Sequence, residues 1–85
     1  MREDYSKFGV RLNANRRKQS MHIPLTEVEA DLGRKLNEHE RRPGPFWQNG
    51  WHYIGGEVTR RGWQVRNVDP NLGLVYLERL PPQGR

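Results

Sequence analysis

The sequence predicts a small α+β domain, in which one helix packs on an antiparallel meander of three or four strands behind a basic, extended N-terminal arm. Three observations support this fold class. A helix-start signal at residues 25–30 precedes apolar residues spaced by four, apolar residues alternate between glycine-rich turns beyond residue 50, and the first 22 residues are mostly polar and basic. We expect an arm at residues 1–22, a domain at 23–80 and a tail at 81–85.

Composition limits both the core and the classes of protein to consider. With 85 residues, of which 33% are apolar, the chain can bury only a modest core. It has no cysteine, which excludes disulfides and thiolate metal sites and fits a reducing compartment. No run of about 18 apolar residues and no signal-peptide pattern occurs. We therefore expect a cytoplasmic protein that does not associate with a membrane.

The N-terminal segment carries six cations against two acids. Phe8, Val10 and Leu12 alternate as in a short strand, within a stretch too polar to fold alone. The polar run that follows contains Arg16, Arg17 and Lys18. Basic arms of this kind neutralise phosphates along nucleic acid, but an ordinary disordered terminus has the same composition.

The clearest local signal is a helix that starts near Thr26. Thr26 and Glu29 form a capping-box pattern, and Pro43-Gly44-Pro45 ends the helical segment. The narrow apolar stripe of this helix consists of Val28, Leu32 and Leu36. Its other face mixes acids with cations, and acids would repel phosphate, so we expect a helix that covers a sheet rather than one that enters a DNA groove.

After the prolines the apolar period changes to two. The predicted strands are Trp51–Ile54, Glu57–Arg60, Trp63–Val68 and Leu74–Leu80, with a bulge at Gly55-Gly56 and turns at Arg61-Gly62 and Asp69–Gly73. A two-residue turn would place Arg60 over Trp63 and Glu57 opposite Arg66. The near-continuous apolar run of the last strand predicts a position that is central in the sheet or covered on both faces. A strongly bent meander with glycine-rich turns is also the pattern of small SH3-like barrels, although no family motif is matched.

The sequence contains no pattern typical of a catalytic or metal site. His22, His39 and His52 lack the spacing of a metal-binding motif, and both serines, Ser6 and Ser20, lie in the predicted arm. The glycine pairs lack the helix that follows a phosphate-cradling loop. We therefore expect a non-enzymatic protein with no catalytic residues, no metal, no cofactor and no small-molecule substrate.

The chemistry that remains is binding. Arginine supplies 12 of the 15 lysines and arginines, and its planar guanidinium grips phosphate at two points. Arginines near aromatic rings are typical of surfaces that bind single-stranded nucleic acid, and the sequence does not distinguish DNA from RNA. We expect Trp47, beside the prolines, to be the exposed tryptophan. The predicted nucleic-acid-binding residues are Arg16, Arg17, Lys18, Arg60, Arg61, Arg66 and Trp47.

The alternative is a protein–protein interaction module. It would be a small subunit of a larger assembly, such as a virion or a ribonucleoprotein, or a small inhibitor of a larger enzyme. Residues 51–60 could then extend the sheet of a partner as an edge strand. The anchors in the arm would be Tyr5, Phe8, Val10 and Leu12. Binding through these anchors depends less on salt than phosphate contacts do.

Overall fold

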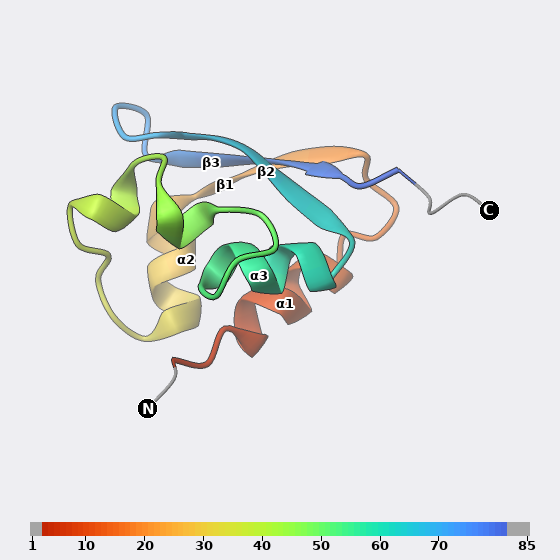
Figure 1. The fold of residues 1–85 in the computed structure, drawn as a ribbon, viewed down its shortest axis with the longest axis horizontal. Coiled ribbons are helices and arrows are strands. Elements are labelled where there is room, and N and C mark those ends of the chain that lie inside the picture. The colour runs from red at the N-terminus through yellow and green to blue at the C-terminus, as the bar shows by residue number, and fades with distance from the viewer. Residues whose placement is uncertain (1–2, 82–85) are drawn as a thin grey trace.

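The computed structural model describes residues 3–81 and arranges them in two layers. A three-stranded antiparallel sheet forms one layer, and the helices all lie on one of its faces (Figure 1). The elements in chain order are α1 (Ser6–Asn13), β1 (Ser20–Pro24), α2 (Leu25–Leu32), the 3-10 helices η1 (His39–Arg41) and η2 (Pro45–Trp47), α3 (Ile54–Arg60), β2 (Trp63–Asp69) and β3 (Leu74–Arg79). The α+β class is confirmed, and the sheet is open rather than a bent, SH3-like barrel.

The expected N-terminal arm is wrong, because this segment folds into the domain. Phe8 and Leu12 lie one helical turn apart on α1 and are fully buried, whereas Val10 points away and is 61% exposed. Phe8, Val10 and Leu12 alternate as in a strand, but Phe8 and Leu12 are also spaced by one helical turn, and the protein folds according to the helical spacing. The chain then continues into β1, which pairs with β3. Of the predicted tail at 81–85, residues 82–85 lie outside the described residues.

The predicted helix after Pro24 is confirmed, but it is shorter than expected. α2 ends at Leu32 because Gly33 adopts a left-handed conformation with φ of 75°. The expected capping box does not form, since no side chain caps the first turn. The Glu29 carboxylate instead accepts a hydrogen bond from the backbone N–H of Leu36 at 2.8 Å. Leu36 is thereby held in the core although it lies beyond the helix.

Residues 54–60 form α3, so the strands expected at 51–54 and 57–60 are wrong. Ile54 and Val58, one turn apart, bury their side chains completely. Gly55 allows the helix to contact the preceding loop, because a Cβ at this position would lie 2.6 Å from the carbonyl carbon of Gln48. The glycine pair therefore serves close packing of a helix and not a bulge in a strand.

The two C-terminal strands form as predicted. β3 lies between β1 and β2, which confirms its central position, and β2 has an irregularity at Arg66, between Val65 and Asn67. The Asp69 carboxylate shapes the turn between β2 and β3 by accepting backbone N–H groups of residues 71 and 72 at 2.9 and 3.1 Å. Trp63, Val68 and other apolar residues of the sheet bury their side chains against the helices.

Candidate nucleic-acid interface

Trp47 is not a surface residue, which corrects the expectation that it would be exposed. Only 2% of it is accessible, and its ring packs edge-on against Phe46 with 5.4 Å between centroids. Its indole Nε1–H donates to the backbone carbonyl of Glu40 at 2.7 Å. The 3-10 helix η2 turns the side chain inward, so this tryptophan cannot stack on a base.

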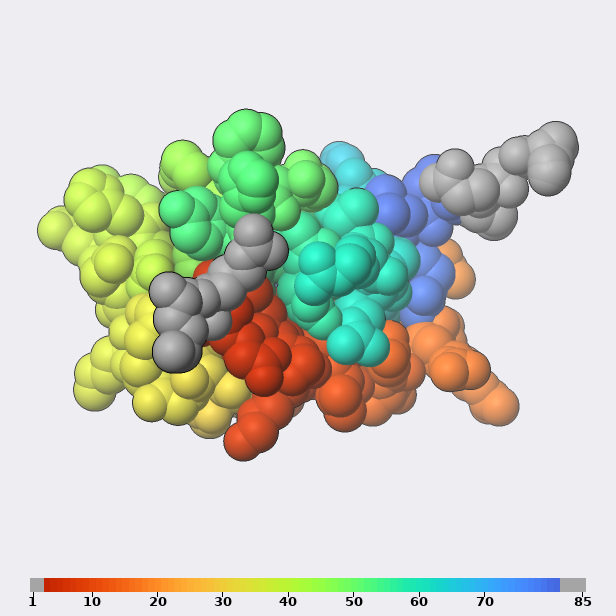
Figure 2. Space-filling view, turned by 60° about the horizontal axis from the view of Figure 1, so that its bottom comes forward, coloured from red at the N-terminus to blue at the C-terminus, as the bar shows by residue number. Residues whose placement is uncertain are grey.

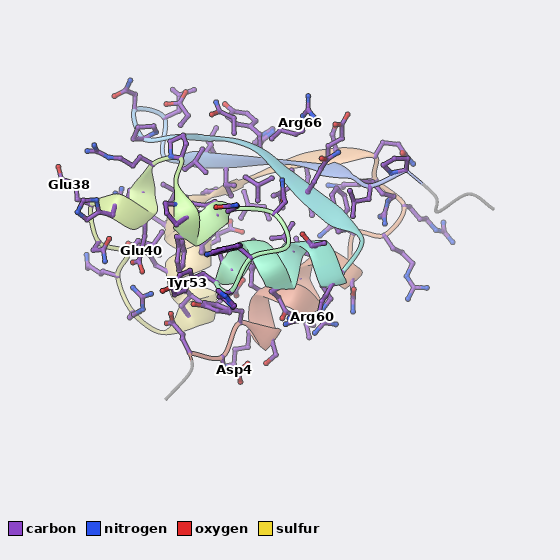
Figure 3. All side chains as sticks on the ribbon, viewed as in Figure 1. Asp4, Glu38, Glu40, Tyr53, Arg60 and Arg66 are labelled. Atoms are coloured by element: carbon purple, nitrogen blue, oxygen red, sulfur yellow. The ribbon has the colours of Figure 1, made fainter. Side chains whose placement is uncertain are left out.

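Arg60 and Arg61 lie at the end of α3 and not at the tip of a hairpin. Both donate to the carboxylate of Glu57, which is 4% exposed, and the bond from Arg61 Nε measures 2.8 Å. Tyr53 lines the same hollow of about 500 Å³ on the helical layer (Figure 3). The expected pair of Glu57 with Arg66 does not form. Arg60 and Arg61 instead share the buried negative charge of Glu57.

The loop of residues 14–19 connects α1 to β1 and carries three adjacent cations that form no ion pair within residues 3–81. Arg16, Arg17 and Lys18 are exposed in it. In Figure 2 the chain between α1 and β1, coloured orange, projects from the body of the molecule. Among residues 3–81 no carboxylate lies within 4.0 Å of these three cations, as judged from the ion pairs of the described residues. We call Arg16, Arg17 and Lys18 the basic loop.

The side chain of Arg79 holds the backbone of the basic loop in place. Its Nε donates to the carbonyl of Lys18 at 3.0 Å, and its Nη2 donates to the carbonyls of Asn15 and Arg16, the former at 3.2 Å. The guanidinium lies over the ring of Trp63, 4.4 Å from its centroid. The cation expected over this indole was Arg60, and the structure places Arg79 there instead. Because Arg79 binds the carbonyls of the loop and not its cationic side chains, these side chains remain available to a ligand.

Most acids of the described chain are engaged elsewhere. Arg11 pairs with two carboxylates of α2 at 2.6 and 2.7 Å, and Arg34 bridges Glu3 and Glu40 at 2.7 and 2.8 Å. Arg34 also lowers the pKa of Glu40 below its ordinary value. These acidic groups lie on the helical side. Their charge is compensated there, and among residues 3–81 the basic loop keeps its three positive charges without such compensation.

The outer face of the sheet, which no helix covers, adjoins the basic loop. It contains a hollow of about 500 Å³ lined by Lys18, His22, Arg66 and Tyr76 together with parts of β1 and β3. Arg66 lies on the outer side of the sheet, away from Arg60 (Figure 3), and it makes an exposed ion pair with Glu78 at 3.3 Å. Lys18 thus belongs both to the basic loop and to this hollow.

The predicted site residues therefore separate into three places. Lys18 and Arg66 line one hollow with the rest of the basic loop beside it, Arg60 and Arg61 line another on the helical layer, and Trp47 is in the core. Sequence reasoning missed His22 and Tyr76 as a pair. Each lies in an alternating segment, but their pairing requires β1, which the sequence did not reveal.

A second surface on the helical layer exposes aromatic side chains. Trp51 and Tyr53 are each 48% exposed, and the ring of His52 lies 5.0 Å from that of Trp51. This segment precedes α3 and is not the edge strand expected at residues 51–60. At the real edge, on β2, the side chain of Asn49 exchanges two hydrogen bonds with the backbone of Val65, at 2.7 and 3.1 Å, and so occupies part of that edge.

Three further findings concern the described part of the chain as a whole. No helix within residues 3–81 has the length and apolar character needed to cross a membrane. In the same range no group of three or more histidine, aspartate or glutamate side chains is arranged to hold a metal ion. Comparison of the chain with protein-family models, with curated proteins and with solved structures finds no significant match.

Proposed function

We propose that this protein binds nucleic acid, and that the basic loop supplies the main contacts to phosphate. The observation that carries the proposal is the set of three adjacent exposed cations with no carboxylate among residues 3–81 to neutralise them. A phosphate chain that binds such a cluster releases counterions, and this release is the largest sequence-independent contribution to protein–nucleic acid affinity.

The way in which the loop is held supports this function. Arg79 fixes three backbone carbonyls of the loop, so less backbone freedom is lost when a ligand binds. Arg16 and Arg17 provide planar, bidentate donors, and Lys18 adds a point charge toward the sheet. A flexible terminal arm with the same charges would lose more entropy on binding.

The test compares two double variants, each of which removes two exposed positive charges that form no ion pair with any of residues 3–81. Arg16→Ala/Arg17→Ala removes them from the basic loop, and Lys7→Ala/Lys35→Ala removes them from the helical side. Affinity for DNA and RNA oligonucleotides is measured by fluorescence anisotropy between 50 and 200 mM salt.

We expect the loop variant to bind more weakly and to reduce the salt slope, d log K/d log[salt], by about 1.4–1.8, which corresponds to two lost phosphate contacts. The control variant should keep its salt slope within about 0.5 of that of the parent protein, since the proposal assigns no phosphate contact to Lys7 or Lys35. Equal losses in both variants would mean that only net charge matters, and would overturn the assignment to the loop.

A protein partner is the second candidate, and the exposed rings of Trp51 and Tyr53 favour it. Such aromatic residues are enriched at the energetic centres of protein interfaces. Under this function, Trp51→Ala/Tyr53→Ala would abolish assembly with the partner, while Arg16→Ala/Arg17→Ala would leave it intact. Size-exclusion chromatography of the native complex from cell extract distinguishes the two outcomes. Assembly that depends on the basic loop and is destroyed by nuclease would instead support nucleic acid.

A further inference from the structure

We infer that the hollow on the outer face of the sheet is a seat for unpaired bases, so that the ligand of this protein is single-stranded nucleic acid. This inference rests on the proposed function and assigns its substrate class. It adds His22 and Tyr76, on neighbouring strands, to the site.

The register of the sheet brings two rings together on the uncovered face. His22 of β1 lies directly opposite Tyr76 of β3, with 6.1 Å between ring centroids and 51° between ring planes. On the other side of β3, Tyr76 pairs with Asn67 of β2. Directly paired residues share a face of the sheet, so an imidazole, a phenol and an amide form one row across it.

A second row lies two residues further along β3 and is polar. Glu78 pairs there with Ser20 of β1 and with Gln64 of β2. The rows combine flat rings, on which a base can stack, with amide and hydroxyl groups that can hydrogen-bond to the edge of a base. The buried faces of β1 and β3, by contrast, carry Ile23 and Val75 in the core. The outer face is therefore polar and exposed to solvent.

Two cations, Lys18 and Arg66, and one carboxylate, Glu78, line the hollow, so the charge balance of its lining favours a phosphate chain. Lys18 lines the hollow and belongs to the basic loop, which runs directly into β1 at Ser20. Arg66, at the irregularity of β2, lines the same hollow. The ion pair of Arg66 with Glu78 is exposed, and exposed pairs are weak, so the guanidinium is free to turn to a phosphate. A strand bound to the basic loop would thus place its next bases over the rings.

Unpaired bases fit this face, and paired bases do not. The rings of His22 and Tyr76 offer stacking contacts, and the faces of a base become available only when it is unstacked from its neighbours. A duplex would present its phosphates to the basic loop but would leave the hollow without a ligand. We therefore expect a preference for single strands that depends on Tyr76.

The experiment measures binding of one mixed-sequence 12-nucleotide strand, as DNA and as RNA, and of the corresponding duplexes, between 50 and 200 mM salt. The variants are Tyr76→Ala, Tyr76→Phe and His22→Ala. Leu72→Ala serves as the control, since Leu72 is 66% exposed in the turn between β2 and β3 and lines neither of the two hollows. Circular dichroism melting shows that each variant is folded before it is compared.

Because stacking on one aromatic side chain contributes about 1–3 kcal/mol per base, we expect Tyr76→Ala to weaken single-strand binding about 5- to 150-fold. Tyr76→Phe and the control should bind like the parent protein, and the salt slope should stay the same in all of them, because no cation is removed. Duplex binding should be insensitive to Tyr76→Ala.

The outcomes separate this inference from the proposal on which it rests. If Arg16→Ala/Arg17→Ala weakens binding while Tyr76→Ala and His22→Ala do not, the base seat is refuted and phosphate binding by the loop stands. A preference for duplex over single strands also refutes the base seat. Absence of binding to any of the oligonucleotides at 50 mM salt refutes the proposed function itself.

Discussion

Arg79 is the residue whose replacement tests most directly how the basic loop is held. Arg79→Met keeps an apolar side chain of similar length over Trp63 but removes the guanidinium, with its three hydrogen bonds to loop carbonyls and its cation–π contact at 4.4 Å. Two of the three hydrogen bonds are exposed, so we take each at the low end of the usual range, about 0.5 kcal/mol. The cation–π contact contributes about 0.5–1 kcal/mol.

Together these contributions predict that Arg79→Met lowers the free energy of unfolding by about 2 kcal/mol, or the melting temperature by about 8–16 °C for a domain of this size. Urea denaturation measures the loss in free energy. Arg42→Met is the matched control, because Arg42 makes only an exposed ion pair with Glu38 at 3.3 Å.

Hydrogen exchange adds a local measurement at the loop itself. The backbone N–H of Lys18 donates to the carbonyl of Asn15 at 3.0 Å, within the turn that Arg79 holds. This amide should exchange faster in Arg79→Met than the change in global stability explains, because the loop can then open on its own. Unchanged exchange at Lys18, together with a loss of stability below about 0.5 kcal/mol, would refute the claim that Arg79 orders the basic loop.

Two further predictions concern the core and its dependence on pH. Gly55→Ala should lower the free energy of unfolding by about 3 kcal/mol, because its Cβ would press on the backbone of Gln48. Gly44→Ala is the control, since a Cβ at Gly44 would have nothing within 4 Å, and it should change the free energy by less than about 0.5 kcal/mol. Urea denaturation measures both, and equal effects would contradict the packing argument. Burial, followed by the negative charge of Glu3, raises the pKa of Tyr5 to about 12. The unfolded chain therefore releases this proton first, so stability that is present below pH 10 should be lost as the pH rises to 12. Tyr5→Phe should lack this loss in denaturation curves recorded across that range, and a loss as large as in the parent protein would assign it to other groups.

The candidate site shows how far side-chain chemistry can be predicted without a fold. Arg16, Arg17 and Lys18 could be selected from the sequence because three adjacent cations with no nearby acid form a local feature. Arg60 and Arg61 could be selected in the same way, but their neutralisation by a buried Glu57 depends on how α3 packs. Whether these five cations bind nucleic acid remains a prediction.

The sequence by itself determined the elements whose signals are local. The turn at residues 69–73, the strands on either side of it and the helix after Pro24 follow from turn residues, alternation and a helix-start signal. The α+β class and the central place of β3 could be predicted from the same signals, because an apolar strand needs partners on both sides.

Only the tertiary structure decided the conformation of the remaining segments. In so short a segment, the spacing of Phe8 and Leu12 fits a strand as well as a helix. A glycine such as Gly55 is likewise compatible with a bulge in a strand and with close packing of a helix. The rest of the core settles each choice, because the helical forms bury Phe8, Leu12 and Ile54 in one cluster. Once α1 and β1 are placed, Arg79 can reach the basic loop more than 60 residues earlier in the chain, a contact that no local pattern encodes.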